Sequence, residues 1–419
     1  MTAKNTIIPE FGPLAGVRVL SLGSIVAGPN TANLLADFGA EVVHIERPGV
    51  GDTLRVLAPF AKHEDKKVST TWAQDARNRL SLTMEFSLDV PECKEMFMDL
   101  VKSSDILVEN MVWLEKLGIY NEELLAANPK LVICHISGFG RPQFGGDPEI
   151  CDRASYDMIG QAYGGYAFIN GNPEPAPPAI VKPWFNDYLS SYVSAFGILS
   201  AYINAEKTGK GQEVDLAQFE ACAKLLADTV VTYSETGAVK RRSGPDSPAF
   251  QPYGLFQDKT GAYMVIGAYG PGVYKRAIQA LGLDINTYSF AEAGGSPQAM
   301  NSERGKELRE YIVNWCGERN CEEIVNHMAK FKVPASKINS VEDIINDPHW
   351  IDRGDIITYR DETLEKDIKA VGIIPKLSGT PGKVWRGAPT LGQDTDEILK
   401  KVLGYSEEKI EVLKEKKLI

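Results

Sequence analysis

Apolar strands alternate with helices near the N-terminus, and this alternation limits the possible folds more than any other feature. Residues 17–23 (VRVLSLG) are apolar and β-rich, and residues 28–40 (GPNTANLLADFGA) have helical periodicity that stops at Gly39. Residues 41–46 (EVVHIE) read as a second strand. Strand, helix and strand at this spacing predict a parallel βαβ unit.

The same alternation continues for another hundred residues. A helix is expected from Pro91 through residue 102, a strand at 106–110 (ILVEN), a helix at 121–128 and a strand at 131–137 (LVICHIS). A long helix is expected from about Asp187, then a strand at 212–218 and a helix at 219–233. This order predicts a large, doubly wound (Rossmann-like) α/β domain.

The texture changes near residue 240. The segment 244–270 is rich in turns, and its GLFQ and AYMVIG stretches predict a hairpin around residues 258–261. Helices are then expected at 271–281, 302–315 and 321–331. We therefore expect a second, smaller α+β domain, followed by a Gly/Pro-rich tail that ends in a charged helix at 395–416.

Charge and cysteine content exclude several classes of protein. The chain has 45 Lys and Arg against 56 Asp and Glu, a net charge of −11, which disfavours a nucleic acid partner. Its 6 cysteines are too sparse for a disulfide scaffold and suggest a reducing compartment. We find neither a signal sequence nor an apolar run of ~18 residues, so we expect a cytoplasmic protein without a membrane span.

Several familiar sites find little support. Glu46 ends the second strand as a ribose-binding acid would, but the turn from Gly23 to Gly28 lacks the glycine spacing of a dinucleotide site. The alternative is that the glycines form a tight turn and that Glu46 caps it or pairs with Arg47. No two histidines have metal-ligand spacing, so no metal site is expected, and a histidine in an apolar strand, such as His44, is more often a satisfied core residue.

Carboxylates are the best source of chemistry. Asp187 follows a Pro-rich loop at the start of the long helix, where the helix dipole stabilises negative charge. The residues alone leave open whether Asp187 is catalytic or an ordinary N-cap. Asp157 is a second candidate, and its alternative is a satisfied polar residue within a short helix.

Motifs along nearly the whole chain resemble family III CoA-transferases, the CaiB/BaiF family. The N-terminal segments FGPLAGVRVLSLGSIVAGP and AEVVHIERPGVGD, the central SDILVEN and NPKLVICHISGFG, and KTGKGQEVDLAQ carry the resemblance. The tail VWRGAPTLGQDTDEILKKVLGYS extends it. Through RASYDMIGQAYGGY and NDPHWIDRG, the sequence is most similar in appearance to carnitine and bile-acid CoA-transferases.

The resemblance implies a covalent mechanism. The position matching the family's nucleophile is Asp187, which would attack an acyl-CoA to give a mixed anhydride and then an aspartyl-CoA thioester; an aspartate with a reference pKa near 3.9 is ionised at pH 7. CoA, as a substrate and not a tightly bound cofactor, would then be passed to a free carboxylic acid of carnitine, bile-acid or related type. The alternative activity is that of an α-methylacyl-CoA racemase, but Ser155 and Tyr156 stand where that enzyme's His would precede Asp157.

The resemblance also assigns binding residues. CoA binding maps onto Val26, Ala27, Arg47, Asn110 and Lys116. Arg77, Arg79 and Arg153 are further candidates for contacts with the CoA phosphates, and Gly138, Gly164 and Gly165 are candidate oxyanion donors. The segment at 246–254, which contains Gln251, matches the family's active-site lid.

The family's architecture suggests how the chain is divided. It implies a CoA-binding α/β domain at 1–210 that carries the nucleophile, a linker and helix at 211–240, a small α+β domain at 241–345, and a return to the large domain at 346–419. It also implies a homodimer of two interlocked rings. The expected partners are thus an acyl-CoA, a small carboxylic acid and a second copy of the chain.

Overall fold

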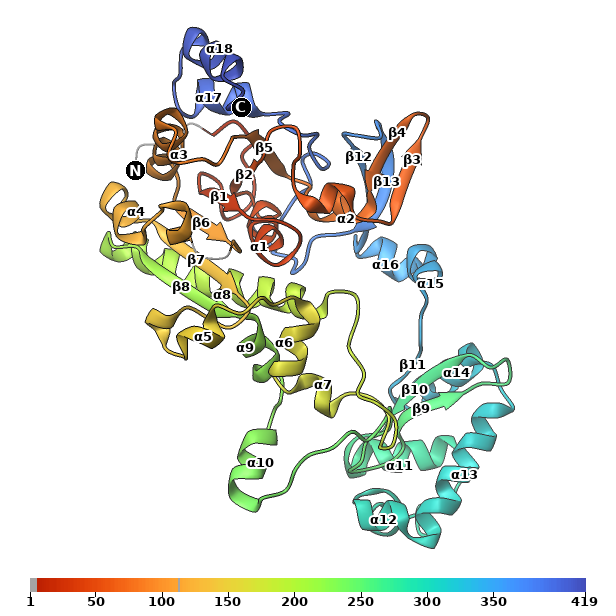
Figure 1. Ribbon diagram of the computed structural model, residues 1–419. Helices are drawn as coiled ribbons and strands as arrows, with labels where there is room; N and C mark the ends of the chain where they lie inside the picture. Colours follow the sequence, from red (N-terminus) through yellow and green to blue (C-terminus); the bar gives the residue numbers. More distant parts are fainter. Residues whose placement is uncertain (1–5, 112–113) are drawn as a thin grey trace. The chain divides into compact units, whose positions relative to one another are not determined.

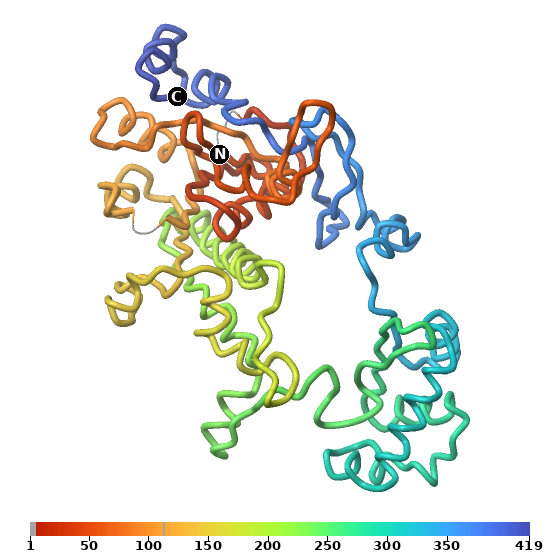
Figure 2. Tube along the Cα trace, turned by 45° about the vertical axis from the view of Figure 1, so that its right-hand side comes forward, coloured from red at the N-terminus to blue at the C-terminus, as the bar shows by residue number. Residues whose placement is uncertain are grey.

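The computed structural model describes residues 6–111 and 114–419 (Figures 1 and 2). The chain divides into two compact units. The large unit holds the described residues up to 166 together with 181–227 and 348–419, and the small unit holds 167–180 and 228–347. Each unit is therefore built from segments that are distant in the sequence.

A parallel sheet forms the centre of the large unit. Its strand order is β5–β2–β1–β6–β7–β8, and every neighbouring pair is parallel. The strands are β1 (Arg18–Leu22), β2 (Glu41–Glu46), β5 (Arg79–Thr83), β6 (Ile106–Glu109), β7 (Val132–Ser137) and β8 (Gln212–Ala217). The predicted βαβ unit is confirmed, and the strand order reverses between β1 and β6, where open α/β sheets bind their ligands.

Alternate residues of each strand reach the two faces of this sheet, because successive side chains point in opposite directions. On one face, Leu20, Val43 and Leu107 pack against α3 (Pro91–Ser103), α4 (Asn121–Ala127), α17 (Thr395–Lys401) and α18 (Glu407–Glu415). On the other, Val19 and Val42 pack against α1 (Ala27–Ala36) and α8 (Phe185–Thr208). Helices on both faces explain why these strands direct apolar side chains to both sides of the sheet.

The C-terminal segment packs along β5 within the large unit. Ser81 N donates to Asp394 Oδ2 at 2.8 Å, and Thr83 N donates to Thr395 Oγ1 at 3.0 Å. The predicted helix at 395–416 is two helices, because the backbone turns at Gly404 with a φ of 70° that glycine adopts without strain. This segment also carries α16 (Pro348–Asp352) and a hairpin of β12 (Ile356–Asp361) and β13 (Lys366–Val371).

The small unit contains an antiparallel sheet of order β11–β10–β9. The predicted hairpin is confirmed as β9 (Tyr253–Gln257) and β10 (Tyr263–Gly267), and Asp258 Oδ1 closes its turn by accepting hydrogen bonds from Thr260 N and Ala262 N. The small unit also contains β11 (Ala335–Lys337), α11 (Gly270–Ala280), α12 (Pro297–Asn301), α13 (Glu303–Gly317), α14 (Cys321–Lys330) and α15 (Val341–Asn346).

The helix predicted at 219–233 is wrong as a single element. The structure has α9 (Gln218–Lys224) and α10 (Thr229–Thr236), separated at Ala227, whose φ is 50°. The remaining short elements are β3 (Phe60–His63), β4 (Lys66–Ser69), α2 (Thr70–Asp75), α5 (Pro148–Cys151), α6 (Asp157–Tyr163) and α7 (Tyr166–Ile169). Among the described residues, no helix has the length and apolar character that crossing a membrane requires.

Candidate active site

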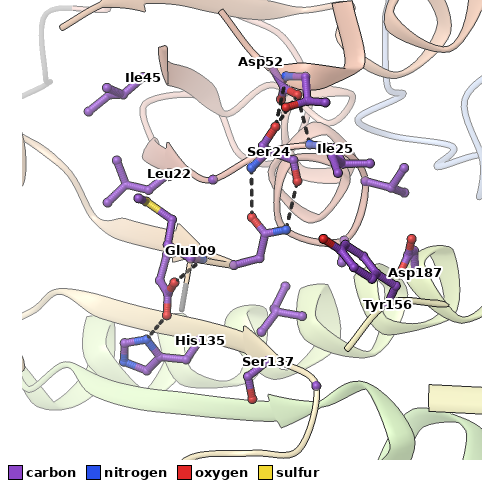
Figure 3. Close-up of a pocket in the computed structure, with 18 of the residues that line it drawn as sticks. Leu22, Ser24, Ile25, Ile45, Asp52, Glu109, His135, Ser137, Tyr156 and Asp187 are labelled. Carbon is purple, nitrogen blue, oxygen red and sulfur yellow. Dashed lines mark hydrogen bonds and ion pairs between the residues drawn. The ribbon is translucent and has the colours of Figure 1, made fainter. Parts of the chain in front are cut away.

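A cavity of about 850 Å³ lies in the large unit at the carboxyl ends of β1, β2, β6 and β7 (Figure 3). Its lining comes from the segments that follow these strands, at residues 22–27, 45–53, 109–111 and 135–141, from residues 84–86, 151 and 153–156, and from Asp187 and Gln218. The volume suits a small-molecule ligand. The site thus lies at the edge of the sheet where the strand order reverses.

The turn after β1 is clamped by one amide side chain. Asn110 Nδ2 donates to the Ser24 carbonyl at 3.0 Å, and Asn110 Oδ1 accepts from Ser24 N at 3.1 Å. A Cβ on Gly23 would lie 1.8 Å from Asn110 Oδ1, so only glycine permits this approach. The tight-turn interpretation of Gly23 is confirmed, and the turn holds Ile25 at a left-handed φ of 72°.

Asp52 holds the same turn from the opposite side. Its Oδ1 accepts hydrogen bonds from Ser24 Oγ at 2.8 Å and Ile25 N at 3.0 Å (Figure 3). His44 Nε2 contacts Asp52 Oδ2 at 3.1 Å. Burial alone would raise the pKa of Asp52, but the hydrogen bonds and the His44 charge lower it to about 2. His44 also contacts Ser21 Oγ, so it is a satisfied core residue, as expected.

Asp187 is the third residue of α8 and is 9% exposed. Its Oδ1 accepts a hydrogen bond from Gln218 Nε2 at 2.5 Å. Burial, together with the nearby charge of Asp157, raises the pKa of Asp187 to about 7, and the Gln218 hydrogen bond opposes this shift. The expectation of complete ionisation at pH 7 is therefore wrong, because the reference pKa applies to a solvated carboxylate.

Three polar contacts fix the first turn of α8. Trp184 occupies the N-cap position with no side-chain cap, so the N-cap interpretation of Asp187 is wrong. Asp157 Oδ1 instead accepts from Asn186 N at 2.6 Å, which satisfies an N–H group that the helix leaves free. Ser191 Oγ contacts the carbonyl oxygens of Ala27 and Asp187, each at 2.9 Å. The start of α8 is thereby tied to the start of α1.

The profile of the family described as CoA-transferase family III matches residues 14–395. The chain belongs to CoA-transferase family III. The protein is therefore a transferase that uses CoA thioesters as substrates. The family resemblance expected from the motifs is confirmed.

Curated and solved relatives of this family III enzyme match nearly its whole length. It is 34% identical to the bile acid CoA-transferase BaiK of Clostridium scindens over 96% of this chain and 88% of that one. It is 35% identical to succinyl-CoA–D-citramalate CoA-transferase of Chloroflexus aurantiacus, covering 97% and 98% of the two chains. A CAIB/BAIF family protein from Brucella suis superimposes with a TM-score of 0.80 at 28% identity, covering 94% and 100%.

The structure brings five of the six predicted site residues of the family III enzyme to one cavity. Val26, Ala27, Arg47, Asn110 and Asp187 line it. The Arg47 side chain is 68% exposed and lies 3.7 Å from Glu85. Lys116 does not line the cavity, and its Nζ contacts Asp152 at 2.8 Å. The two predicted phosphate-binding cations therefore have different surroundings.

Two other arginines suggested for phosphate are buried in the family III fold. Arg77 pairs with Asp37 at 2.7 Å, and Arg79 donates to the Asp75 carbonyl at 2.5 Å. Neither lines the cavity, whereas Arg153 does. Glu46 pairs with Arg55 at 2.7 Å and not with Arg47, so that expectation is also wrong.

The expected glycine donors are separated in space. Gly138 lines the cavity, but Gly164 and Gly165 do not. A Cβ on Gly164 would lie 2.5 Å from the Phe219 carbonyl oxygen, so this glycine permits close packing of α6 on α9. Of the three, only Gly138 stays a candidate oxyanion donor.

Sequence reasoning missed several residues of the site. Gln218, Tyr156 and Glu109 line the cavity, and Gln218 contacts the Asp187 carboxylate directly. His135 Nδ1 contacts Glu109 Oε1 at 2.6 Å (Figure 3), and although burial opposes it, this contact raises the pKa of His135. A signal was present for Gln218, because it ends a strand at the same edge of the sheet as Asn110.

Gln251, in the small unit, anchors the segment that the family resemblance compares with a lid. Its side chain is 4% exposed, and Nε2 donates to the carbonyl oxygens of Ala293 and Gly305, each at 2.7 Å. Gln251 N also donates to the Gly294 carbonyl at 3.0 Å. In the described structure this residue therefore holds its own unit together.

Proposed function

We propose that the enzyme moves CoA from an acyl-CoA to a free carboxylic acid through covalent intermediates on Asp187. The observation that carries this proposal is a buried carboxylate on a cavity of CoA-compatible size, with one oxygen held by Gln218. Burial keeps the carboxylate poorly solvated and therefore reactive once it is ionised. The match to family III supports the same reaction.

The reaction balances without a redox step. Asp187 Oδ2 attacks the thioester carbonyl, and the carbon–sulfur bond breaks to release the CoA thiolate and leave a mixed anhydride. The thiolate then attacks Cγ of Asp187, which releases the donor acid and leaves an aspartyl-CoA thioester. The acceptor carboxylate repeats the two steps in reverse and leaves as its own CoA thioester.

Two groups support the proposed placement of CoA. Arg47 lines the cavity with its side chain 68% exposed, so it can approach the phosphates of a CoA bound there. The clamped turn offers the backbone N–H groups of Val26 and Ala27 at the start of α1, which Ser191 ties to the start of α8. We place the reacting carbonyl between this turn and Asp187.

The acceptor is a carboxylic acid whose remainder contacts the cavity walls. Relatives are named for bile acids, D-citramalate and L-carnitine, which share a carboxylate but differ in size and charge. Tyr156 lines the cavity with 72% of its surface exposed, and it can pack against an apolar or cationic acid. We therefore propose the carboxylate as the common feature of the substrates.

We also propose a homodimer. The inner face of α8 packs on the sheet through Ile198 and Ala201, yet its outer face carries Phe196 at 75% and Ile203 at 53% exposure. A helix that is apolar on both faces is normally covered on both. The full-length match to family III supports a second copy as the covering partner, in the interlocked arrangement that the resemblance implies.

The cysteines support a cytoplasmic location. All of them are free and buried: Cys93, Cys134, Cys151, Cys222, Cys316 and Cys321. Reduced thiols are typical of proteins kept in a reducing compartment. We propose the cytoplasm on this ground.

Mass spectrometry after incubation with an acyl-CoA tests the mechanism. We expect a CoA thioester on the peptide that contains Asp187, and none in Asp187→Ala. A thioester on a different residue would contradict the assignment of the nucleophile. Absence of any adduct, together with exchange of the α-proton in deuterated water, would instead favour the racemase-like alternative.

A further inference from the structure

The two oxygens of the Asp187 carboxylate have different surroundings. Oδ1 accepts the Gln218 hydrogen bond at 2.5 Å. Within residues 6–111 and 114–419, no other side chain hydrogen-bonds this carboxylate, so Oδ2 is the oxygen left for the substrate. Both residues line the same cavity, and Gln218 is 7% exposed. Gln218 therefore holds the Asp187 carboxylate in one orientation through Oδ1 alone.

We propose that Gln218 is a catalytic residue that keeps Oδ1 fixed through the whole reaction and stabilises negative charge on it. This inference rests on the proposed role of Asp187 as nucleophile. It assigns different fates to the two oxygens: Oδ2 forms the bonds to substrate, and Oδ1 stays on the enzyme. Gln218 is the last residue of the motif KTGKGQEVDLAQ, but the resemblance assigned it no role.

The chemistry requires a donor at this position. When the CoA thiolate attacks Cγ of the mixed anhydride, the electron pair of the Cγ=Oδ1 bond moves onto Oδ1. It returns as the bond from Cγ to Oδ2 breaks, so Oδ2 leaves with the donor acid. When the acceptor carboxylate attacks Cγ of the thioester, charge again develops on Oδ1. An N–H group already aimed at Oδ1 stabilises both tetrahedral intermediates.

The fold holds the Gln218 side chain firmly. Gln218 follows β8, which pairs with the buried strand β7 through Ala217, and it is the first residue of α9. Glu220 Oε2 accepts from Ala217 N at 3.1 Å and so fixes the start of α9. Gln218 also packs against Gly160 of α6, because a Cβ on that glycine would lie 3.3 Å from the Gln218 Cβ. A donor held in place before the reaction needs no reorganisation during it.

The first experiment measures single steps. Gln218→Met keeps the side-chain length but removes the donor. With a pre-formed thioester on Asp187, we expect the acceptor acid to discharge CoA about 10²–10³-fold more slowly in Gln218→Met than in the unchanged protein. Gln212→Met, which makes the same change at the exposed start of β8, is the matched control and should discharge at the normal rate.

The second experiment follows the oxygens and separates catalysis from a merely structural role. The unchanged enzyme turns over many times with an acceptor acid labelled with oxygen-18 in its carboxylate, and the Asp187 peptide is then weighed. Each cycle delivers one acceptor oxygen to the Oδ2 position. We expect one labelled oxygen on Asp187 however many cycles pass, and two in Gln218→Met, where the carboxylate can rotate between cycles.

The outcomes distinguish the two proposals. A thioester on Asp187 together with two labelled oxygens in the unchanged enzyme would overturn the role of Gln218 and leave the nucleophile intact. A normal discharge rate in Gln218→Met would do the same. A thioester at another residue would instead overturn the proposed function itself. The measurement on the unchanged enzyme decides the question even if Gln218→Met does not fold.

Discussion

The side-chain amide of Asn110 pairs with both backbone groups of Ser24, at 3.0 Å and 3.1 Å. This two-point contact joins the segments after β6 and β1, which are neighbouring strands at the point where the sheet order reverses. It allows the turn to keep Ile25 in a left-handed conformation. Asn110 therefore shapes the cavity in addition to lining it.

Removal of this clamp should weaken both fold and function. We expect Asn110→Ala to lower the free energy of unfolding by about 1–3 kcal/mol, because the Ser24 groups lose their partners. We also expect KM for the acyl-CoA to rise, since the turn is no longer held. Thermal unfolding and initial rates check this. Asn314→Ala, at an exposed position of α13, is the control, and equal effects of the two changes would contradict the role of the clamp.

The rate of acylation should depend on the protonation of Asp187. Only the ionised carboxylate attacks, and the pKa of Asp187 in the free enzyme is about 7. We therefore expect kcat/KM for the acyl-CoA to rise with pH and to level off above about pH 7, since this parameter reflects groups of the free enzyme. A profile that is flat from about pH 5 to 8 would show that Asp187 has a normal pKa.

The raised pKa of Asp187 should also lower the free energy of unfolding at high pH. The pKa of Asp187 is higher in the folded protein than in the unfolded chain, so between about pH 4 and 7 only the unfolded chain has lost the proton. The free energy of unfolding therefore falls as pH rises through this range. We expect Asp187→Asn to be more stable than the unchanged protein by on the order of 2 kcal/mol at pH 8 and by less at pH 4.

Unfolding midpoints of both proteins across this pH range provide the measurement. Asp89→Asn, at an exposed position, is the matched control and should leave the pH dependence of stability unchanged. A constant difference between Asp187→Asn and the unchanged protein at all pH values would contradict the raised pKa.

Arg47 and Lys116 should contribute unequally to CoA binding. Arg47 lines the cavity, whereas Lys116 lies outside it and contacts Asp152. We expect Arg47→Ala to raise KM for the acyl-CoA about tenfold, because one charged hydrogen bond to CoA is lost. We expect Lys116→Ala to change this KM by no more than about threefold. Steady-state kinetics at low and moderate salt show which of the two substitutions raises KM more. A larger effect of Lys116→Ala would show that Lys116, and not Arg47, is the main CoA-binding cation.

A charge on the outer face of α8 should separate the proposed dimer. Phe196 is 75% exposed in the single chain, and Phe196→Asp would bury a carboxylate if a second copy covers this face. We expect the mass measured by light scattering to fall from that of a dimer to that of one chain. Phe144→Asp, at a residue 53% exposed, is the control. An unchanged mass for Phe196→Asp would place the interface elsewhere.

The local sequence pattern predicted helices and strands better than it predicted the breaks between helices. The strands at 17–23, 41–46 and 131–137 could be recognised because strands covered on both faces carry apolar residues toward both sides of the sheet. The break at Ala227 was missed because its side chain gives no warning of a left-handed φ. The break at Gly404 carried a usable signal, because glycine commonly ends helices.

The candidate site divides in a similar way. Asp187, Asn110 and Arg47 could be named from motifs, and the structure brings all three to one cavity. Lys116 was named by the same reasoning but lies outside the cavity. A motif specifies where Lys116 lies along the chain, but its place relative to the cavity depends on how the chain packs, and there Lys116 contacts Asp152 instead.

The order of apolar and polar residues already implied a parallel sheet and placed Asp187 at the start of a long helix, because the periodicity of side chains in strands and helices follows from local geometry. The state of Asp187 did not follow from that order. Its partner Gln218 is 31 residues away in the chain, and its raised pKa comes from burial and from Asp157 on another helix. Desolvation and hydrogen bonding depend on which segments pack together, and only the folded chain decides that.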